Sequence, residues 1–255
     1  MMAAVSPRPL EGLRVLLTRP AVDATDRWSL ALSAAGADVV PYPTIQILPP
    51  PSWEPLDQAL TQLQRFDWLI FTSRPAVLFT AARLPGGRFA SGMSRPQIAA
   101  VGKETARALE AAGARVALVP EDQRQEGLIA ALAGLPTGTR LLFPHAFAGR
   151  EALIHSLRQQ GCEVDAVAVY QTAPRAPLPP PPAFDVAIFA SPSALRVFVE
   201  QHGSACLGGK LVAAIGPTTA EQALAHGIAP VVAAHPSIEA LVSAIAEARP
   251  GKGEP

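Results

Sequence analysis

The stretch Leu211–Gly227, LVAAIGPTTAEQALAHG, decides the fold class of this chain. Its apolar run ends at Gly216-Pro217, and the apolar residues then follow a helical period instead of a strand-like one. A strand–turn–helix of this kind leaves backbone N–H groups beyond the carboxyl end of the strand, where open α/β sheets bind ligands. Thr218 or Thr219 is expected to cap the helix. Because a helix N-terminus carries partial positive charge, the turn is typical of an anion site.

The chain contains a second copy of this stretch and of two others. IAAVGKETARALEAAG, from Ile98, aligns with the stretch from Val212, at an offset of 212 − 98 = 114 residues. FDWLIFTSRPAV, from Phe66, matches FDVAIFASPSAL, from Phe184 (184 − 66 = 118). GLRVLLTRP, from residue 12, matches GTRLLFPHA, from residue 138 (138 − 12 = 126). Three ordered pairs at a nearly constant offset indicate a duplicated α/β half, and a period this long is not typical of a solenoid.

Strands alternate with helices along both halves, and this order predicts parallel sheets of the doubly wound type. Ser73 and Ser191 are expected to cap the helices that follow two of the buried strands. Strands are predicted over residues 13–18, 39–40, 44–48, 68–72, 116–119, 141–144, 164–172, 186–190, 211–215 and 231–234. Helices are predicted over residues 23–35, 56–63, 76–83, 127–135, 149–160 and 238–248, and after each copy of the opening turn.

Composition excludes several classes of protein. The 255 residues have a formal net charge of zero and a pI near 7.0, so no basic excess favours nucleic acid or an anionic membrane. No apolar run reaches the roughly 18 residues of a membrane span. The N-terminal residues lack the continuous apolar core of a signal peptide, and we expect a cytoplasmic protein. The two cysteines predict no disulfide framework.

The familiar catalytic motifs are missing. No G-x-G-x-x-G follows a predicted strand, and Gly102-Lys103-Glu104 lacks the Ser or Thr that follows lysine in a phosphate loop. No G-x-S-x-G elbow occurs. The five histidines show no metal-ligand spacing. Nucleotide, metal and hydrolytic-triad chemistry are therefore all disfavoured.

The ordered set LLTRP, FTSRPAV, AAVGKETA, GREAL, VAVYQT, FASPSAL and AAIGPTTAEQAL resembles the uroporphyrinogen-III synthase family, over about Leu13 to Leu241. The resemblance implies two similar flavodoxin-like α/β domains joined by a two-stranded hinge. One domain is expected to combine residues 11–41 with 177–250, and the other to span 44–168. The linkers, about 42–50 and 169–182, coincide with the proline-rich stretches, and residues 1–10 and 251–255 are expected to be loose.

The same resemblance implies a reaction. Members of the family close linear hydroxymethylbilane to uroporphyrinogen III, with inversion of ring D and loss of water, and use neither cofactor nor metal. The substrate carries eight carboxylates, so the task is largely one of positioning in a cleft between domains that can close. We expect a cytoplasmic monomer, without nucleic-acid or membrane partners, that makes at most transient contact with the upstream deaminase.

Two kinds of residue are predicted to form the site. Tyr170 is the candidate general acid, whose phenol would donate a proton to the departing hydroxyl. Arg19 is a natural bidentate partner for a carboxylate. Helix N-termini and hydroxyl groups would bind further carboxylates without a large positive charge. The predicted substrate-binding residues are Thr18, Arg19, Ser73, Gly102, Thr105, Ser191, Ser193, Gly216, Thr218 and Thr219.

Departures from the family pattern fall in the middle of the chain. Arg74-Pro75 stands where small or polar residues are common, Glu104 replaces the equivalent of Thr218, and Phe143–His145 replaces an arginine/glycine turn. These weaken the anion-binding case for the middle domain. The residues also have plainer roles as caps, turn glycines or packed strand residues. A non-catalytic two-lobed ligand-binding protein and a regulatory relative remain alternatives.

Overall fold

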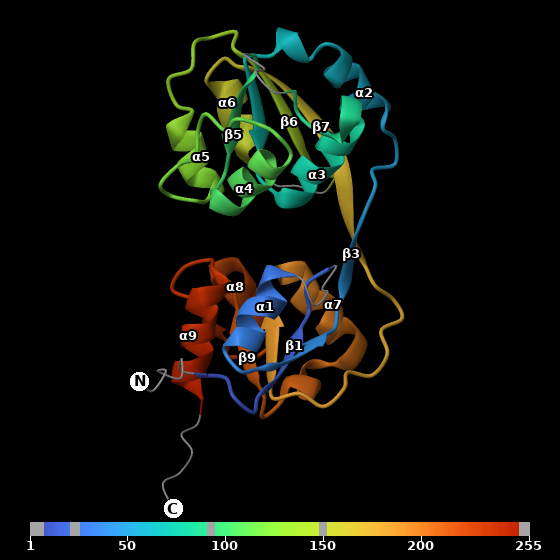
Figure 1. Ribbon diagram of the computed structural model, residues 1–255, viewed down its shortest axis with the longest axis vertical. Coiled ribbons are helices and arrows are strands. Elements are labelled where there is room, and N and C mark those ends of the chain that lie inside the picture. Colours follow the sequence, from blue (N-terminus) through green and yellow to red (C-terminus); the bar gives the residue numbers. More distant parts are fainter. Residues whose placement is uncertain (1–7, 21–25, 91–94, 148–151, 250–255) are drawn as a thin grey trace, which may run out of the picture. The chain divides into compact units, whose positions relative to one another are not determined.

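The computed structural model describes residues 8–20, 26–90, 95–147 and 152–249. The chain divides into two compact units (Figure 1). The terminal unit combines Met1–Gln46 with Ala173–Pro255, and the middle unit is Ile47–Thr172. In the described part of the chain no helix is long and apolar enough to cross a membrane.

The terminal unit is built on a five-stranded sheet with the order β10-β9-β8-β1-β2. Its paired strands are parallel. Taken in chain order, this is the 2-1-3-4-5 arrangement of a flavodoxin-like doubly wound sheet. The strands are β1 (Arg14–Leu17), β2 (Asp38–Pro41), β8 (Val186–Phe189), β9 (Leu211–Ala214) and β10 (Val231–Val232).

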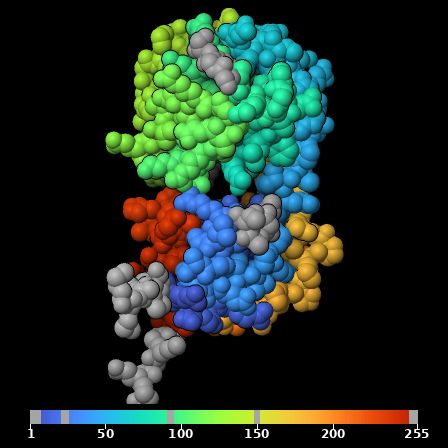
Figure 2. Space-filling view, viewed as in Figure 1, coloured from blue at the N-terminus to red at the C-terminus, as the bar shows by residue number. Residues whose placement is uncertain are grey.

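Helices cover both faces of this sheet, because the side chains that the strands direct to each face are apolar. In β8 all four residues are buried, with Val186 and Ile188 in one core and Ala187 and Phe189 in the other. Helices α1 (Arg27–Ala34) and α9 (Ile238–Ala248) supply Leu32, Leu241 and Ile245 to the first core, and they lie side by side on the surface of this unit (Figure 2). Helices α7 (Pro192–His202) and α8 (Pro217–Ala225) cover the second.

The middle unit has a sheet with the order β3-β7-β6-β4-β5. The strands are β3 (Ile45–Leu48), β4 (Trp68–Phe71), β5 (Gln97–Ala100), β6 (Arg140–Ala146) and β7 (Glu163–Pro174). The prediction of a strand over Val116–Val119 is wrong, because this segment forms only an isolated parallel bridge, Ala99 with Leu118. Its backbone bonds to β5 are too few to make a ladder.

The middle unit also has one core on each side of its sheet. One core contains Phe71, Val77 and Leu109, and the other contains Phe143, Leu128 and Leu153. The helices that follow the strands are α2 (Glu54–Thr61), α3 (Arg74–Arg83), α4 (Lys103–Ala111), α5 (Gln125–Ala131) and α6 (Ala152–Gln159). Short 3-10 turns occur at Leu63–Arg65, Pro85–Gly87 and Ser204–Leu207.

The duplication is visible in the strand orders. By sequence alignment β6 corresponds to β1, β4 to β8 and β5 to β9, and each occupies the equivalent place in its sheet. The predicted α/β class is confirmed, with a five-stranded sheet in each unit. The start of the predicted helix 149–160 and residues 23–25 of the helix 23–35 fall outside the described residues.

Candidate active site

The N-terminus of α8 is an open group of backbone donors. Gly216 is the N-cap in an extended conformation, and no side chain caps the helix. Since Pro217 has no N–H, the amides of Thr218 and Thr219 are the first donors of the helix. Thr218 is exposed, whereas the side chain of Thr219 is buried. The prediction that one of these threonines caps α8 is wrong, because the helix begins one residue before them.

The equivalent N-terminus in the middle unit differs at its first residues. Gly102 is the N-cap of α4, and the Oε1 atom of Gln123 accepts a hydrogen bond from the Lys103 N–H at 2.9 Å. This donor has no counterpart in α8, where the equivalent residue is Pro217. Glu104 adds a carboxylate to the first turn, where it pairs with Arg107 at 2.8 Å. Gln123 lies in a polar loop, and no local pattern predicts its contact with α4.

Two serines cap the helices that follow the central strands. Ser73 Oγ accepts from the Ala76 N–H at 3.3 Å, and Ser191 Oγ accepts from the Ala194 N–H at 3.2 Å. Both caps were predicted from the sequence and are confirmed. Each hydroxyl keeps its own proton, which remains able to donate to a bound anion. Ser193 lies in the first turn of α7 and is partly buried.

Thr18 and Arg19 follow β1 in the terminal unit. The Thr18 hydroxyl is buried and donates to the Ile188 carbonyl at 2.7 Å, so it joins β1 to β8 beyond the ladder. The Arg19 guanidinium lies 4.3 Å from the centroid of the Trp28 ring. Its Nη1 atom is 3.7 Å from Asp26 Oδ1. Stacking and the nearby carboxylate restrict the orientation of Arg19. The sequence analysis did not single out Trp28 or Asp26.

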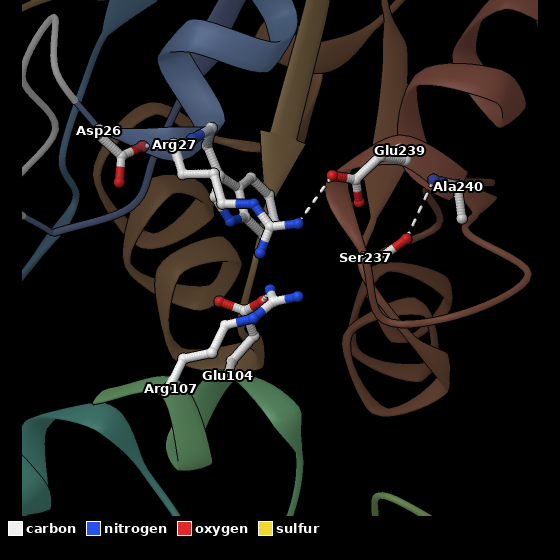
Figure 3. Close-up of polar contacts among 8 residues, drawn as sticks. Asp26, Arg27, Glu104, Arg107, Ser237, Glu239 and Ala240 are labelled. Carbon is white, nitrogen blue, oxygen red and sulfur yellow. Dashed lines mark hydrogen bonds and ion pairs between the residues drawn. The ribbon is translucent and has the colours of Figure 1, made fainter. Parts of the chain in front are cut away.

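Asp26 and Ser237 are the N-caps of α1 and α9, the two helices that lie side by side in the terminal unit. Asp26 caps α1 by accepting from the Trp28 N–H at 3.0 Å. Ser237 caps α9 by accepting from the Ala240 N–H at 3.2 Å. Figure 3 shows the ion pair that joins the two helices, Arg27 Nη2 to Glu239 Oε1 at 2.8 Å. A backbone hydrogen bond within its own residue and the Arg27 contact lower the pKa of Glu239.

Tyr170 lies at the carboxyl end of the middle sheet. It pairs with Ala146 of β6, and its carbonyl accepts from the Phe147 N–H at 2.7 Å. The ring packs against the core and lies nearly parallel to Phe79, with centroids 6.4 Å apart. Among the described residues its hydroxyl takes no hydrogen bond. Packing therefore fixes the ring while the phenol stays available as a donor.

Thr105 differs from the other candidates in the middle unit. Its side chain is buried within α4, near the N-terminus that Gln123 contacts. In the middle unit Ser73 and Gly102 follow strands, and Tyr170 pairs with the last residue of β6. In the terminal unit Arg19, Ser191 and Gly216 follow strands. Carboxyl ends of parallel strands meet at one edge, so each unit gathers its candidates at that edge. In the described residues no group of three or more acidic, histidine or cysteine side chains has metal-binding geometry.

This duplicated chain is similar to known proteins in both sequence and fold. A family model described as "Uroporphyrinogen-III synthase HemD" matches residues 26–243. The chain belongs to the uroporphyrinogen-III synthase family. A curated uroporphyrinogen-III synthase from Synechococcus elongatus is 34% identical over 229 residues, which cover 83% of this chain and 86% of the relative. The activity is therefore that of a uroporphyrinogen-III synthase, a hydro-lyase of tetrapyrrole biosynthesis.

Solved structures of the family have the same fold. The uroporphyrinogen-III synthetase of Helicobacter pylori aligns with a TM-score of 0.63 at 19% identity, over 93% of this chain and 100% of that one. A mutant uroporphyrinogen-III synthase from Thermus thermophilus aligns with a TM-score of 0.59 at 18% identity, over 92% and 96% of the two chains. At these identities the likeness concerns the fold alone.

Proposed function

We propose that the chain cyclises linear hydroxymethylbilane to uroporphyrinogen III, with inversion of ring D and loss of water. The observation that carries the proposal is the duplicated strand–turn–helix, which gives each unit helix N-termini at the carboxyl edge of its sheet. Neutral donors of this kind suit a substrate with eight carboxylates, because they bind anions in a chain of zero formal charge.

We assign the terminal unit the larger share of carboxylate binding. Its α8 amides carry no side-chain cap, and Arg19 is held by Trp28. Ser191 and Ser193 add hydroxyl donors at the start of α7. Each carboxylate contact at an exposed helix end contributes about 0.3–1 kcal/mol, so several together restrict a flexible tetrapyrrole to one shape. The middle unit contributes through Ser73, Gly102 and Thr105.

The proton for the leaving group is assigned to Tyr170. In the proposed step the phenol donates its proton to the hydroxyl of the hydroxymethyl group, which departs as water. Ring closure then releases a proton from the attacking pyrrole carbon, and this proton restores the phenol. The packed ring and the hydroxyl without a hydrogen bond among the described residues support this role. For this proton transfer the proposal requires one weak general acid.

We also propose the domain boundaries given by the resemblance, residues 11–41 with 177–250 and residues 44–168. A cytoplasmic, monomeric enzyme that uses no cofactor and makes at most transient contact with the upstream deaminase completes the proposal. Gel filtration with light scattering checks the monomer. Activity after exhaustive treatment with a chelator checks the independence from metal.

The decisive assay measures which isomer forms. Hydroxymethylbilane is supplied by a coupled deaminase, and the product is oxidised and separated into the type I and type III porphyrins. We expect type III to dominate, at a rate well above spontaneous closure. Type I alone, at the uncatalysed rate, would contradict the proposal and favour a non-catalytic ligand-binding or regulatory relative. A heat-inactivated sample of the same chain is the control.

A further inference from the structure

Helices α3 and α7 are equivalent elements of the duplication, and both begin at a serine cap. Ser73 and Ser191 are 191 − 73 = 118 residues apart, the offset of the aligned stretches that contain them. Each serine belongs to the proposed substrate-binding set. The opposite ends of these two helices carry polar side chains that the proposed reaction does not use.

The C-terminal end of α7 holds the segment by which the chain returns to the terminal unit. Gln201 Oε1 accepts from the Leu178 N–H at 2.7 Å, and Gln201 Nε2 donates to the Arg175 carbonyl at 3.1 Å. One side-chain amide therefore satisfies two backbone groups of the segment that follows β7. The first turn of α7 holds the outgoing segment as well, because the Thr44 hydroxyl donates to the Ala194 carbonyl at 2.9 Å.

A second contact lies one residue further along α7. The buried Tyr42 hydroxyl donates to the Pro179 carbonyl and lies 2.7 Å from Nε2 of His202. Since the phenol has one proton, His202 Nε2 is the donor to the phenol oxygen. Burial raises the pKa of Tyr42 above its ordinary value of 10.0, and the nearby Cys206 adds to the shift. The two connecting segments, at Tyr42 and Pro179, are thus tied to the same helix end.

The middle unit uses the equivalent helix position for the same purpose. Position 201 − 118 = 83 is Arg83, near the end of α3. Its guanidinium makes a two-pronged contact with Asp57, from Nε to Oδ1 at 2.9 Å and from Nη2 to Oδ2 at 2.7 Å. It also lies 5.4 Å from the centroid of the Trp53 ring. Trp53 and Asp57 lie at the start of α2, the first helix after the chain has entered the middle unit.

We propose that Arg83 and Gln201 are positioning residues that couple the connecting segments to the substrate-binding serines. In each unit the segment arriving from the other unit is anchored at the C-terminal end of a helix whose N-terminal serine faces the ligand edge. A helix transmits a displacement along its axis, about 16 Å for the 11 residues of α7. The anchors thereby set the position of Ser73 and Ser191. This inference rests on the proposed binding of substrate at these serines.

Stability and positioning predict different results for these anchors. Arg83 and Asp57 are 39% and 40% exposed, and their two-pronged geometry makes the pair stronger than most exposed ion pairs. Gln201 satisfies two backbone groups, whose loss also lowers stability. A purely structural role therefore predicts that removing either anchor lowers the thermal midpoint and leaves the turnover of the folded chain unchanged. A positioning role predicts a loss of turnover and of isomer selectivity, because a displacement of about 1 Å costs up to 10²-fold in rate.

The test compares Gln201→Ala and Arg83→Ala with a matched control, Arg196→Ala. Arg196 lies on α7, and its one ion pair with a described residue is within that helix, with Glu200 at 2.8 Å. We expect each anchor variant to lower kcat by about fivefold or more and to raise the share of type I product, in an assay run well below its thermal midpoint. Arg196→Ala should match the wild type. Anchor variants that behave like Arg196→Ala would overturn the proposal.

Two further variants keep the test decisive. Reversing the pair, with Arg83→Asp and Asp57→Arg combined, should restore much of the turnover that each single change loses. If Gln201→Ala fails to fold, Gln201→Glu retains the acceptor for Leu178 and removes only the donor to Arg175. An unchanged share of type I product in this variant would count against the proposal.

Hydrogen exchange tests the coupling without any substrate. The Ala194 N–H, which donates to Ser191 Oγ, should exchange faster in Gln201→Ala than in the wild type and in Arg196→Ala. Unchanged exchange at Ala194 would show that α7 does not transmit the loss of the Gln201 contacts to its N-terminal end. A wild-type chain that makes only type I product would contradict the proposed function, and the exchange measurement would still decide the coupling.

Discussion

The two copies of the opening strand–turn–helix have the same backbone at the turn but differ in the first residues of the helix. In both, a glycine in an extended conformation is the N-cap, and the helix that follows is nine residues long. At α8 the first residue is Pro217, which has no N–H, whereas at α4 the Lys103 N–H donates to Gln123 and Glu104 adds negative charge. The difference favours an anion at α8 over α4, because the first turn of α8 carries no carboxylate.

The largest effect on turnover is expected at Tyr170, the proposed general acid, which lies in the middle unit. Tyr170→Phe keeps the ring that lies parallel to Phe79 and removes only the hydroxyl. We expect kcat to fall by roughly 10²–10⁴-fold, the usual contribution of general acid catalysis, with an unchanged thermal midpoint. Steady-state kinetics with isomer analysis measures this. A loss within about tenfold would give Tyr170 a positioning or packing role instead.

An exchange of residues between the copies tests the asymmetry directly. Thr218→Glu places in α8 the carboxylate that α4 carries at Glu104, and it should repel the substrate. We expect KM to rise by about fivefold, which corresponds to about 1 kcal/mol at a helix N-terminus. The matched change Glu104→Thr should alter KM by less than about twofold, since Gln123 still occupies the Lys103 amide. Equal effects at both positions would contradict the asymmetry.

The glycines give a smaller effect, on stability. A methyl group at Gly216 meets no atom within 4 Å, so Gly216→Ala should cost only the difference between glycine and alanine as N-caps, less than the same change at Gly102. At Gly102 the same methyl group lies 3.0 Å from Gln123 Oε1 and displaces this cap. We expect Gly102→Ala to lose about 1 kcal/mol, the usual contribution of a helix cap, and to lower the midpoint by about 2–4 °C. Thermal unfolding of both variants in parallel measures the difference.

The smallest effect concerns acid stability in the middle unit. The hydrogen bond from Arg83 lowers the pKa of Asp57 below its ordinary value of 3.8. Because the folded pKa is depressed, the stabilisation is complete well above pH 3.8 and is lost as the pH falls through the folded pKa. Asp57→Asn should therefore be slightly less stable than the wild type at pH 7, with a gap that closes in acid. Urea unfolding at pH 7 and pH 3 measures the gap, and a constant gap would contradict the prediction.

Local patterns in the sequence were sufficient for much of the fold. Continuous apolar runs such as residues 186–189 predicted buried parallel strands, and the serine–proline turns predicted the caps at Ser73 and Ser191, which are confirmed. The strand predicted over residues 116–119 is wrong, because whether an apolar run extends a sheet depends on hydrogen bonds to its neighbour. The observed N-cap of α8, Gly216, lies two or three residues before the predicted caps, Thr218 and Thr219.

The sequence by itself determined the α/β class, the duplication and the family, since periodicity and ordered motifs are properties of the chain read in one dimension. The tertiary structure alone decided which group accepts from the first N–H of α4 and which group holds the segment that follows β7. Gln123 lies 20 residues from the amide it caps, and Gln201 lies 26 residues from the carbonyl it binds. Contacts between segments so far apart depend on how helices pack on a sheet, and no local propensity encodes that arrangement.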